Sequence, residues 1–273
     1  MFSFKEKTPI RLVIGLNQVD KMIPGGWNEK LNCPTKEAEE QLEKRAKDII
    51  SKLSKIAQLS DTHIEYYSAL KRYRLIPLLS KVIANAYAGF KLDHIKPRDP
   101  FELADPEVKA FADEQRAKRN KGNQQDSNLF LEELSKYLSP QDTKLLQEKL
   151  AQEKQRPPKV AILGKAGVGK TTTINSVFNA EWKTSHTTVG TTEAQMKEFE
   201  LKDGGGTLSV VDLPGYGRSL KEDAKYDEIY QSVIPSCDVV LLIMQADARD
   251  LTDDQEMILK LTQWLKKSPT PQR

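Results

Sequence analysis

Apolar residues along the chain follow two alternating patterns. Short, nearly continuous apolar runs are typical of strands buried on both faces, and longer segments with an apolar residue every three or four positions are typical of helices with one buried face. The short runs predict strands at 11–16, 63–67, 159–163, 195–201, 208–211 and 239–244. Their alternation with helical segments predicts an α/β fold, in which a mostly parallel six-stranded sheet carries helices on both faces.

Two segments near the start of the chain have the period of an amphipathic helix. The apolar positions are Ala38, Leu42, Ala46, Ile49, Leu53 and Ile56 in the first, and Ile76, Leu79, Ile83 and Ala86 in the second. Further helices are expected from about 170 to 178 and from about 253 to 266. Each would cover one face of the sheet.

Residues 91–157 interrupt this alternation with several prolines and a polar run at 120–128. We interpret them as a linker with amphipathic helices at 129–138 and after 139, between a first part at 1–90 and a last part at 158–273. Residues 96–157 hold twelve basic and twelve acidic side chains. The basic cluster at 116–121 is therefore interpreted as a solvated helix face, and no specific DNA binding is expected.

The composition points to an ordinary globular protein. Hydrophobic residues make up 38% and charged residues 30%, and 42 Lys and Arg against 39 Asp and Glu leave a net charge of +3. Disorder, a collagen-like fibre and a strong polyanion-binding field are excluded on these figures. No apolar run suits a transmembrane segment or a secretory signal, so a cytoplasmic protein is expected. Cys33 and Cys237 belong to no metal-binding pattern and are expected to be ordinary thiols.

The strongest motif is a buried-strand pattern that runs directly into GxxxxGK[ST] at residues 159–171. Such a loop points successive backbone N–H groups at phosphate oxygens, and the following helix adds the positive end of its dipole. Lys170 would neutralise the β- and γ-phosphates, and the Thr171 hydroxyl would bind Mg²⁺. The predicted nucleotide contacts here are Gly164, Ala166, Gly167, Val168, Gly169, Lys170, Thr171 and Thr172.

A second candidate follows about forty residues later, where a strand ends in Asp212-Leu-Pro-Gly215. A carboxylate at the end of a strand beside the phosphate loop could hold a metal-bound water. Between the two motifs lies a Thr-rich loop at 186–192, and one of its hydroxyls could reach both Mg²⁺ and the γ-phosphate.

With these motifs the chain resembles the TRAFAC-class GTPases, most closely the Era/septin-like branch with its Gly-Thr-Thr switch loop. The resemblance covers nearly all of the chain except about 96–155. It implies a Ras-like G domain that binds GTP or GDP with Mg²⁺. It makes Lys170, Thr192 and Gly215 the catalytic residues, with Thr191 a weaker alternative to Thr192. The Mg²⁺ ligands would be Thr171, Thr192 and Asp212.

The resemblance also extends to the residues that read the base. Asn17-Gln18-Val19-Asp20 resembles the Asn/Thr-Lys-x-Asp motif of the family, in which the Asp accepts hydrogen bonds from guanine N1 and N2, a pattern that adenine cannot offer. Gln18 departs from the family's Lys, whose stem covers the base, so affinity is expected to suffer. The residues Ser68, Ala69 and Leu70 resemble the last motif, where a backbone N–H would meet guanine O6.

The order of the motifs is circularly permuted relative to ordinary GTPases, because the base-reading motifs precede the phosphate loop. An x-Pro-x-Arg step occurs both at 8–11 and at 270–273. Two explanations compete: one permuted domain, natural or engineered, that closes through the linker, or the tail of one GTPase joined to the head of another. We favour the first. Under the second, the halves could pair between chains in a swapped homodimer.

Turnover is expected to be slow, because Tyr216 stands where some GTPases have a Gln that orients water. Catalytic assistance would come from a partner, a dimer or a cation. Arg218 is more consistent with a surface residue than with an arginine finger. Segments 183–192 and 215–226 are expected to act as switches. Alternatives are a nucleotide-dependent scaffold without useful turnover, or an ATPase, against which Asn17 and Asp20 argue. The partner, a protein or a ribosomal effector, is not specified by the sequence.

Overall fold

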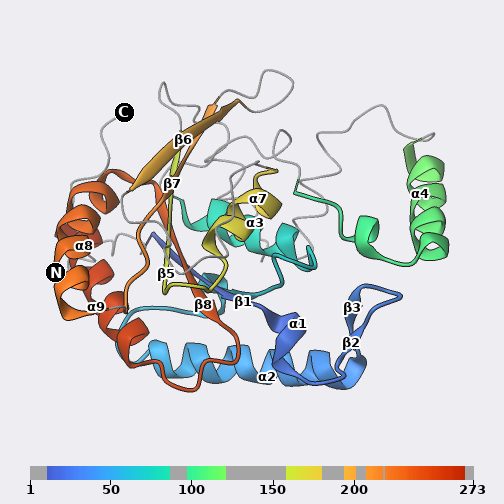
Figure 1. Cartoon of the computed structure of the whole chain (residues 1–273), viewed down its shortest axis with the longest axis horizontal. Helices are drawn as coiled ribbons and strands as arrows, with labels where there is room; N and C mark the ends of the chain where they lie inside the picture. The colour runs from blue at the N-terminus through green and yellow to red at the C-terminus, as the bar shows by residue number, and fades with distance from the viewer. Residues whose placement is uncertain are drawn as a thin grey trace, which may run out of the picture.

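A computed structural model of the chain describes residues 11–86, 97–120, 158–179, 194–200, 207–217 and 219–267. The largest element is a six-stranded sheet (Figure 1). Its strands are β1 (Leu12–Asn17), β4 (Ile64–Tyr66), β5 (Lys159–Gly164), β6 (Gln195–Glu200), β7 (Thr207–Asp212) and β8 (Val239–Gln245). Each strand lies within one or two residues of a predicted one, which confirms the mostly parallel α/β fold.

The order of the strands is β4-β1-β8-β5-β7-β6, and only β6 and β7 pair antiparallel. The strand β1 pairs with β8 along its whole length, from Leu12 opposite Val240 to Asn17 opposite Gln245. The first strands of the chain therefore complete the sheet formed by its last strands, and the two parts pair within one chain.

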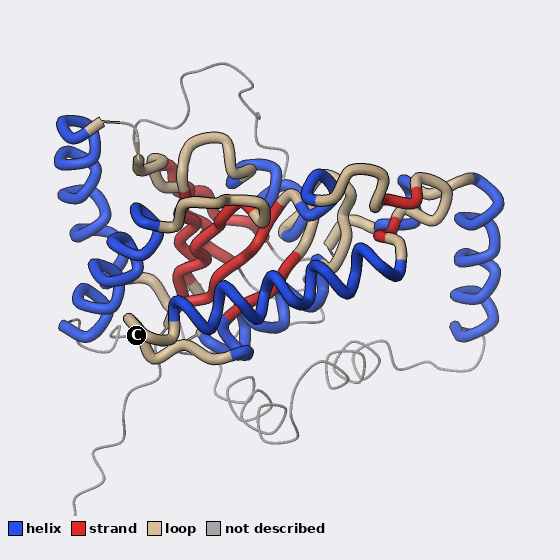
Figure 2. The backbone as a smooth tube through the Cα atoms, turned by 90° about the horizontal axis from the view of Figure 1, so that it is seen from below, coloured by secondary structure: helices blue, strands red, loops and turns tan. Residues whose placement is uncertain are grey.

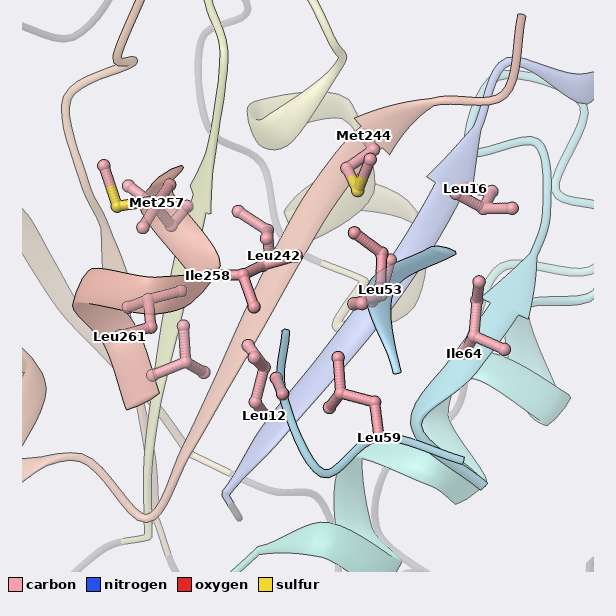
Figure 3. Packing of buried hydrophobic residues seen from close by; sticks show 14 of the residues in the cluster. Leu12, Leu16, Leu53, Leu59, Ile64, Leu242, Met244, Met257, Ile258 and Leu261 are labelled. Carbon is pink, nitrogen blue, oxygen red and sulfur yellow. The ribbon is translucent and has the colours of Figure 1, made fainter. Parts of the chain in front are cut away.

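The strands β1, β4, β5, β7 and β8 are buried on both faces, whereas residues 195–198 of the edge strand β6 are exposed. Along β8, Val240, Leu242 and Met244 face one layer of the core, and the residues between them face the other. Figure 3 shows the first layer, where Leu242 and Met244 lie near apolar side chains from β1 and from two helices. This double burial holds the carboxyl ends of neighbouring strands in register.

Helices cover both faces of the sheet. One layer of the core contains buried side chains of α2 (Lys36–Leu53), α8 (Leu220–Val233) and α9 (Thr252–Lys267), and the other contains those of α3 (Leu75–Asn85) and α7 (Lys170–Val177). In Figure 2, α2 lies in front of the sheet. Thr35 caps α2 by accepting a hydrogen bond from the Ala38 N–H at 3.3 Å. The predicted apolar face of α2 is buried, and the helix ends three residues before Ile56.

Several elements differ from the sequence-based expectation. A short hairpin of β2 (Trp27–Asn28) and β3 (Cys33–Pro34) follows the single-turn helix α1 (Val19–Met22). Part of the predicted linker forms the 3₁₀ turn η2 (Pro100–Leu103) and the helix α4 (Pro106–Asn120), which lies apart from the sheet (Figures 1 and 2). The Phe111 side chain on α4 is exposed, and none of the α4 residues 106–114, whose burial is described, is fully buried.

The turns η1 (Asp61–His63) and η4 (Ile234–Ser236) complete the described elements. The helices predicted at 129–138 and after 139 lie outside the described residues. Both Cys33 and Cys237 are free thiols, as expected, and burial raises the pKa of the Cys237 thiol to about 11. Among the described helices none is long and apolar enough to span a membrane.

Candidate nucleotide site

The predicted site residues that the structure describes gather at one edge of the sheet. They lie at or just beyond the carboxyl ends of β5, β7, β1 and β4. In a parallel sheet these ends share an edge, which is where α/β proteins bind ligands.

The loop between β5 and α7 has the shape that its glycines require. Gly169 has a φ of 91°, and a Cβ at this position would lie 2.5 Å from Asn17 Nδ2, so that a side chain is excluded. Lys170 begins α7 and is buried, and its Nζ donates to the carbonyl oxygens of Gly164 at 3.1 Å and Lys165 at 3.2 Å. The ammonium group is thus held across the loop.

The other predicted loop residues occupy the same turn. Gly164 is the last residue of β5, and Thr172 lies near the start of α7. The loop between them contains Ala166, Gly167 and Val168. A Cβ at Gly164 would lie 2.3 Å from the Ile243 carbonyl oxygen, so the close approach of β5 to β8 requires glycine there.

Two candidate metal ligands lie together beside this loop. Asp212 ends β7 and is 1% exposed, and Thr171 Oγ1 donates to its Oδ2 at 3.3 Å. A hydroxyl and a carboxylate are oxygen ligands of the kind that Mg²⁺ prefers. The donor set therefore fits this cation. Thr192 and Thr191 lie outside the described residues.

Asn17 connects the base-reading residues to the phosphate loop. Its side chain is 2% exposed, its Nδ2 donates to the Val168 carbonyl oxygen at 2.8 Å, and its Oδ1 accepts from the Ala69 N–H at 2.9 Å. These two partners lie 151 and 52 residues away in the sequence. One carboxamide therefore joins three separate segments.

Gln18 makes a second connection. It has a left-handed backbone with a φ of 67°, and its Nε2 donates to the Gly167 carbonyl oxygen at 3.0 Å, while its Oε1 accepts from Gln245 Nε2 at 3.3 Å. A neutral amide thus contacts the phosphate loop where the resembled family has a lysine.

Asp20 and Ser68 lie in contact, as two base-reading residues would. The Ser68 hydroxyl is fully buried, donates to Asp20 Oδ1 at 2.6 Å and accepts from the Lys71 N–H at 3.0 Å. These bonds fix the orientation of the carboxylate. The Ala69 N–H is bonded to Asn17, and the Leu70 side chain is 60% exposed.

Gly215 lies directly against the phosphate loop. A Cβ on this residue would come within 2.9 Å of the Ala166 backbone nitrogen and 3.1 Å of Lys170 Nζ. The next side chain, Tyr216, points away into the core, where its hydroxyl donates to Asp254 Oδ1 at 2.6 Å. Arg218 lies outside the described residues.

The ion pairs between the phosphate loop and α9 were not predicted from the sequence. Lys165 Nζ forms ion pairs with Asp253 Oδ2 at 3.1 Å and Asp254 Oδ2 at 3.2 Å, both in the first turn of α9. Burial by itself would lower the pKa of Lys165, but hydrogen bonds and Coulomb attraction from the two carboxylates raise it above its ordinary value. No motif contains Asp253 or Asp254, and only tertiary structure brings them to the loop.

Comparison with known proteins bears on this arrangement. Residues 159–271 match the sequence model of the family described as 50S ribosome-binding GTPase. This part of the chain is therefore similar to a P-loop GTPase domain. The match begins with β5 and includes the phosphate loop, Asp212 and Gly215. Such domains bind guanine nucleotides.

The chain is also similar to curated proteins. The chain is 34% identical to the uncharacterized protein YkfA of Escherichia coli K12 over 98 residues, which are 36% of this chain and 34% of the relative. It is 33% identical over 98 residues to the uncharacterized protein YfjP of the same organism, with the same shares of both chains. The GTPase Der of Pseudothermotoga lettingae is 33% identical over 98 residues, 34% of this chain and 22% of the relative. The chain thus spans about a third of the length of YkfA and YfjP.

Proposed function

We propose that the chain binds GTP and hydrolyses it to GDP and phosphate with Mg²⁺, at one site built from both parts of the chain. The observation that carries this proposal is the Asn17 side chain, which bonds both the phosphate loop at Val168 and the base-reading segment at Ala69. A bridge of this kind holds the two ends of a nucleotide site at a fixed separation.

At the phosphate end, Lys170 would neutralise the β- and γ-phosphates, and the loop N–H groups would donate to their oxygens. The Lys170 ammonium group already lies across the loop, where it is hydrogen-bonded to two carbonyl oxygens. Little reorganisation would therefore be needed when phosphate binds. Gly215 would place its backbone beside the γ-phosphate, because it lies against Lys170 and Ala166.

Thr171 and Asp212 would hold Mg²⁺, together with Thr192 from the predicted switch loop. The adjacency of the Thr171 hydroxyl to the buried Asp212 carboxylate supports this set. When bound, the cation would neutralise charge on the β- and γ-phosphate oxygens.

At the base end, Asp20 would accept from guanine N1 and N2, with Ser68 holding the carboxylate in place. The Ala69 N–H donates to Asn17 here, so a bond from it to guanine O6 would have to be shared with that carboxamide. Gln18 would cover one face of the base from its position on Gly167.

Turnover would be slow without assistance. Tyr216 is buried and bonded to Asp254, so it cannot orient the attacking water. This observation also favours the second candidate function, a nucleotide-dependent scaffold or sensor without useful turnover. In either case the protein would act as a switch for a partner, a protein or a ribosomal effector. We also propose that the domain belongs to the Era/septin-like branch and is a circularly permuted domain closed within one chain, with a domain-swapped homodimer as the alternative.

Multiple-turnover phosphate release tests the proposal. The purified chain should release phosphate from GTP in Mg²⁺ and not from ATP, and Lys170→Ala should remove the activity. Tight GDP binding with no release above that of Lys170→Ala would favour the scaffold. Equal release from GTP and ATP would contradict the role of Asp20.

A further inference from the structure

The segment that carries Gly215 is anchored on both sides by buried tyrosine hydroxyls. Before it, the Pro214 carbonyl oxygen accepts from Tyr230 Oη on α8 at 2.8 Å. After it, Tyr216 Oη donates to Asp254 Oδ1 on α9 at 2.6 Å. The three anchoring side chains are each no more than 2% exposed, so water does not compete for these bonds.

The same Asp254 carboxylate also contacts the phosphate loop. Its Oδ2 lies 3.2 Å from Lys165 Nζ, and Lys165 directly follows Gly164 in the loop. Burial, and then the charge and hydrogen bond of Asp254, raise the pKa of Tyr216 well above its ordinary value, so the phenol stays a donor. Asp254 thus contacts the Lys165 cation of the phosphate loop through one oxygen and the phenol of Tyr216, which follows Gly215, through the other.

We propose that Asp254 is a positioning residue that fixes Gly215 relative to the phosphate loop and thereby sets how strongly the protein distinguishes GTP from GDP. This inference rests on the proposed function, in which Gly215 meets the γ-phosphate. GDP lacks that phosphate and is held by the phosphate loop and the base-reading residues. A displaced Gly215 should therefore weaken GTP contacts and leave those to GDP largely intact.

Two variants test the inference. Asp254→Asn removes one of the two charges that attract Lys165, and Tyr216→Phe removes only the phenol hydroxyl and keeps its ring in the core. The matched control is Asp227→Asn, which removes an ion pair between the same two helices, at 2.5 Å from Lys260 Nζ, and touches neither loop. Thermal unfolding of each variant identifies the temperature range in which all of them are folded.

Calorimetry with GDP and with a non-hydrolysable GTP analogue gives the decisive readout, and phosphate release gives kcat and KM. Both site variants should lose about 10-fold in affinity for the analogue and about 10-fold in kcat, because small misplacements of a contacting group carry penalties of this order or larger. Their GDP affinity should stay within about 2-fold of the wild type, as should all values for Asp227→Asn.

Several results would overturn the inference. Equal losses in affinity for GDP and the analogue would give Asp254 a general structural role, and unchanged affinities for both would remove its role altogether.

If Asp254→Asn does not fold, Tyr216→Phe decides the question alone. If the wild type fails to turn over GTP, the ratio of the two affinities still tests the inference. Failure of the wild type to bind either nucleotide would reject the proposed function and the inference together.

Discussion

The two ends of the proposed site are held together in different ways. At the phosphate end the motif is continuous, and Lys170 bonds carbonyl oxygens five and six residues before it. At the base end, Asp20 and Ser68 are 48 residues apart and meet only in the folded chain. The first end is therefore encoded locally, whereas the second depends on β1 and β4 pairing in the sheet.

Asn17 makes the two ends depend on each other. Its carboxamide is buried between Val168 and Ala69, so each end supplies one of its hydrogen-bond partners. The difference between the ends predicts that removal of the Lys170 ammonium group acts mainly on nucleotide binding. Changes at Asn17 should also act on the stability of the fold.

The largest effect is expected from Lys170→Ala. Loss of the ammonium group removes charge-assisted bonds to phosphate, so the affinity for GDP should fall on the order of 100-fold or more. Calorimetry measures this change, with Lys109→Ala on exposed α4 as the control. Binding that is unchanged in Lys170→Ala would place the phosphate site elsewhere.

Asp20→Asn should act on the choice of base. An amide cannot accept from both guanine N1 and N2, so the preference for GDP over ADP should fall by about 10- to 100-fold with little change in unfolding temperature. Competition between the two nucleotides measures the preference, and Asp48→Asn on the exposed face of α2 is the control. A preference that survives in Asp20→Asn would mean that another residue reads the base.

Asn17→Ala should lower both stability and affinity. It leaves the Val168 carbonyl and the Ala69 N–H without their partner, at a cost of roughly 2 to 4 kcal/mol in the free energy of unfolding. Denaturant unfolding measures this cost. Asn85→Ala is the control, because Asn85 likewise makes two side-chain hydrogen bonds, both donated to carbonyl oxygens, but lies partly exposed at the end of α3, away from the site. Equal costs for both variants would remove the special role of Asn17.

Gln18→Ala should have a smaller effect. The variant loses the exposed hydrogen bonds to Gly167 and Gln245, so GDP should dissociate about 2- to 10-fold faster. Gln18→Lys restores the side chain of the resembled family and should slow dissociation. Stopped-flow release of a fluorescent GDP analogue distinguishes these variants, and identical rates in all three proteins would show that position 18 does not cover the base.

The smallest effect concerns His63, which precedes the amino end of β4, whereas Ser68 and Ala69 follow its carboxyl end. Burial lowers its pKa below the ordinary value of 6.5, so protons bind the unfolded chain more readily than the folded one. Stability should therefore decrease as the pH falls below about 6.5, and His63→Gln should reduce this decrease. Denaturant midpoints at pH 7.5 and pH 5.5 measure it. An identical pH dependence in both proteins would contradict the sign of the shift.

The contrast between the two ends also explains what the sequence could predict. The six strands of the large sheet were predicted, five of them because each is a short apolar run, and the phosphate loop was predicted because its eight residues are contiguous. The hydrogen-bond partner of Tyr216 was not predicted, because Asp254 lies in no motif and is 38 residues away. Exposed α4 and the four-residue hairpin ladder were also missed, because neither has an apolar period.

The most direct test is a calorimetric titration of the wild-type chain in Mg²⁺, with GDP and separately with ATP. One site built from Asn17, Asp20 and the loop at Gly164 to Thr171 predicts one GDP bound per chain and no ATP bound. A folded chain that binds neither nucleotide would contradict the single site, and so would equal binding of both.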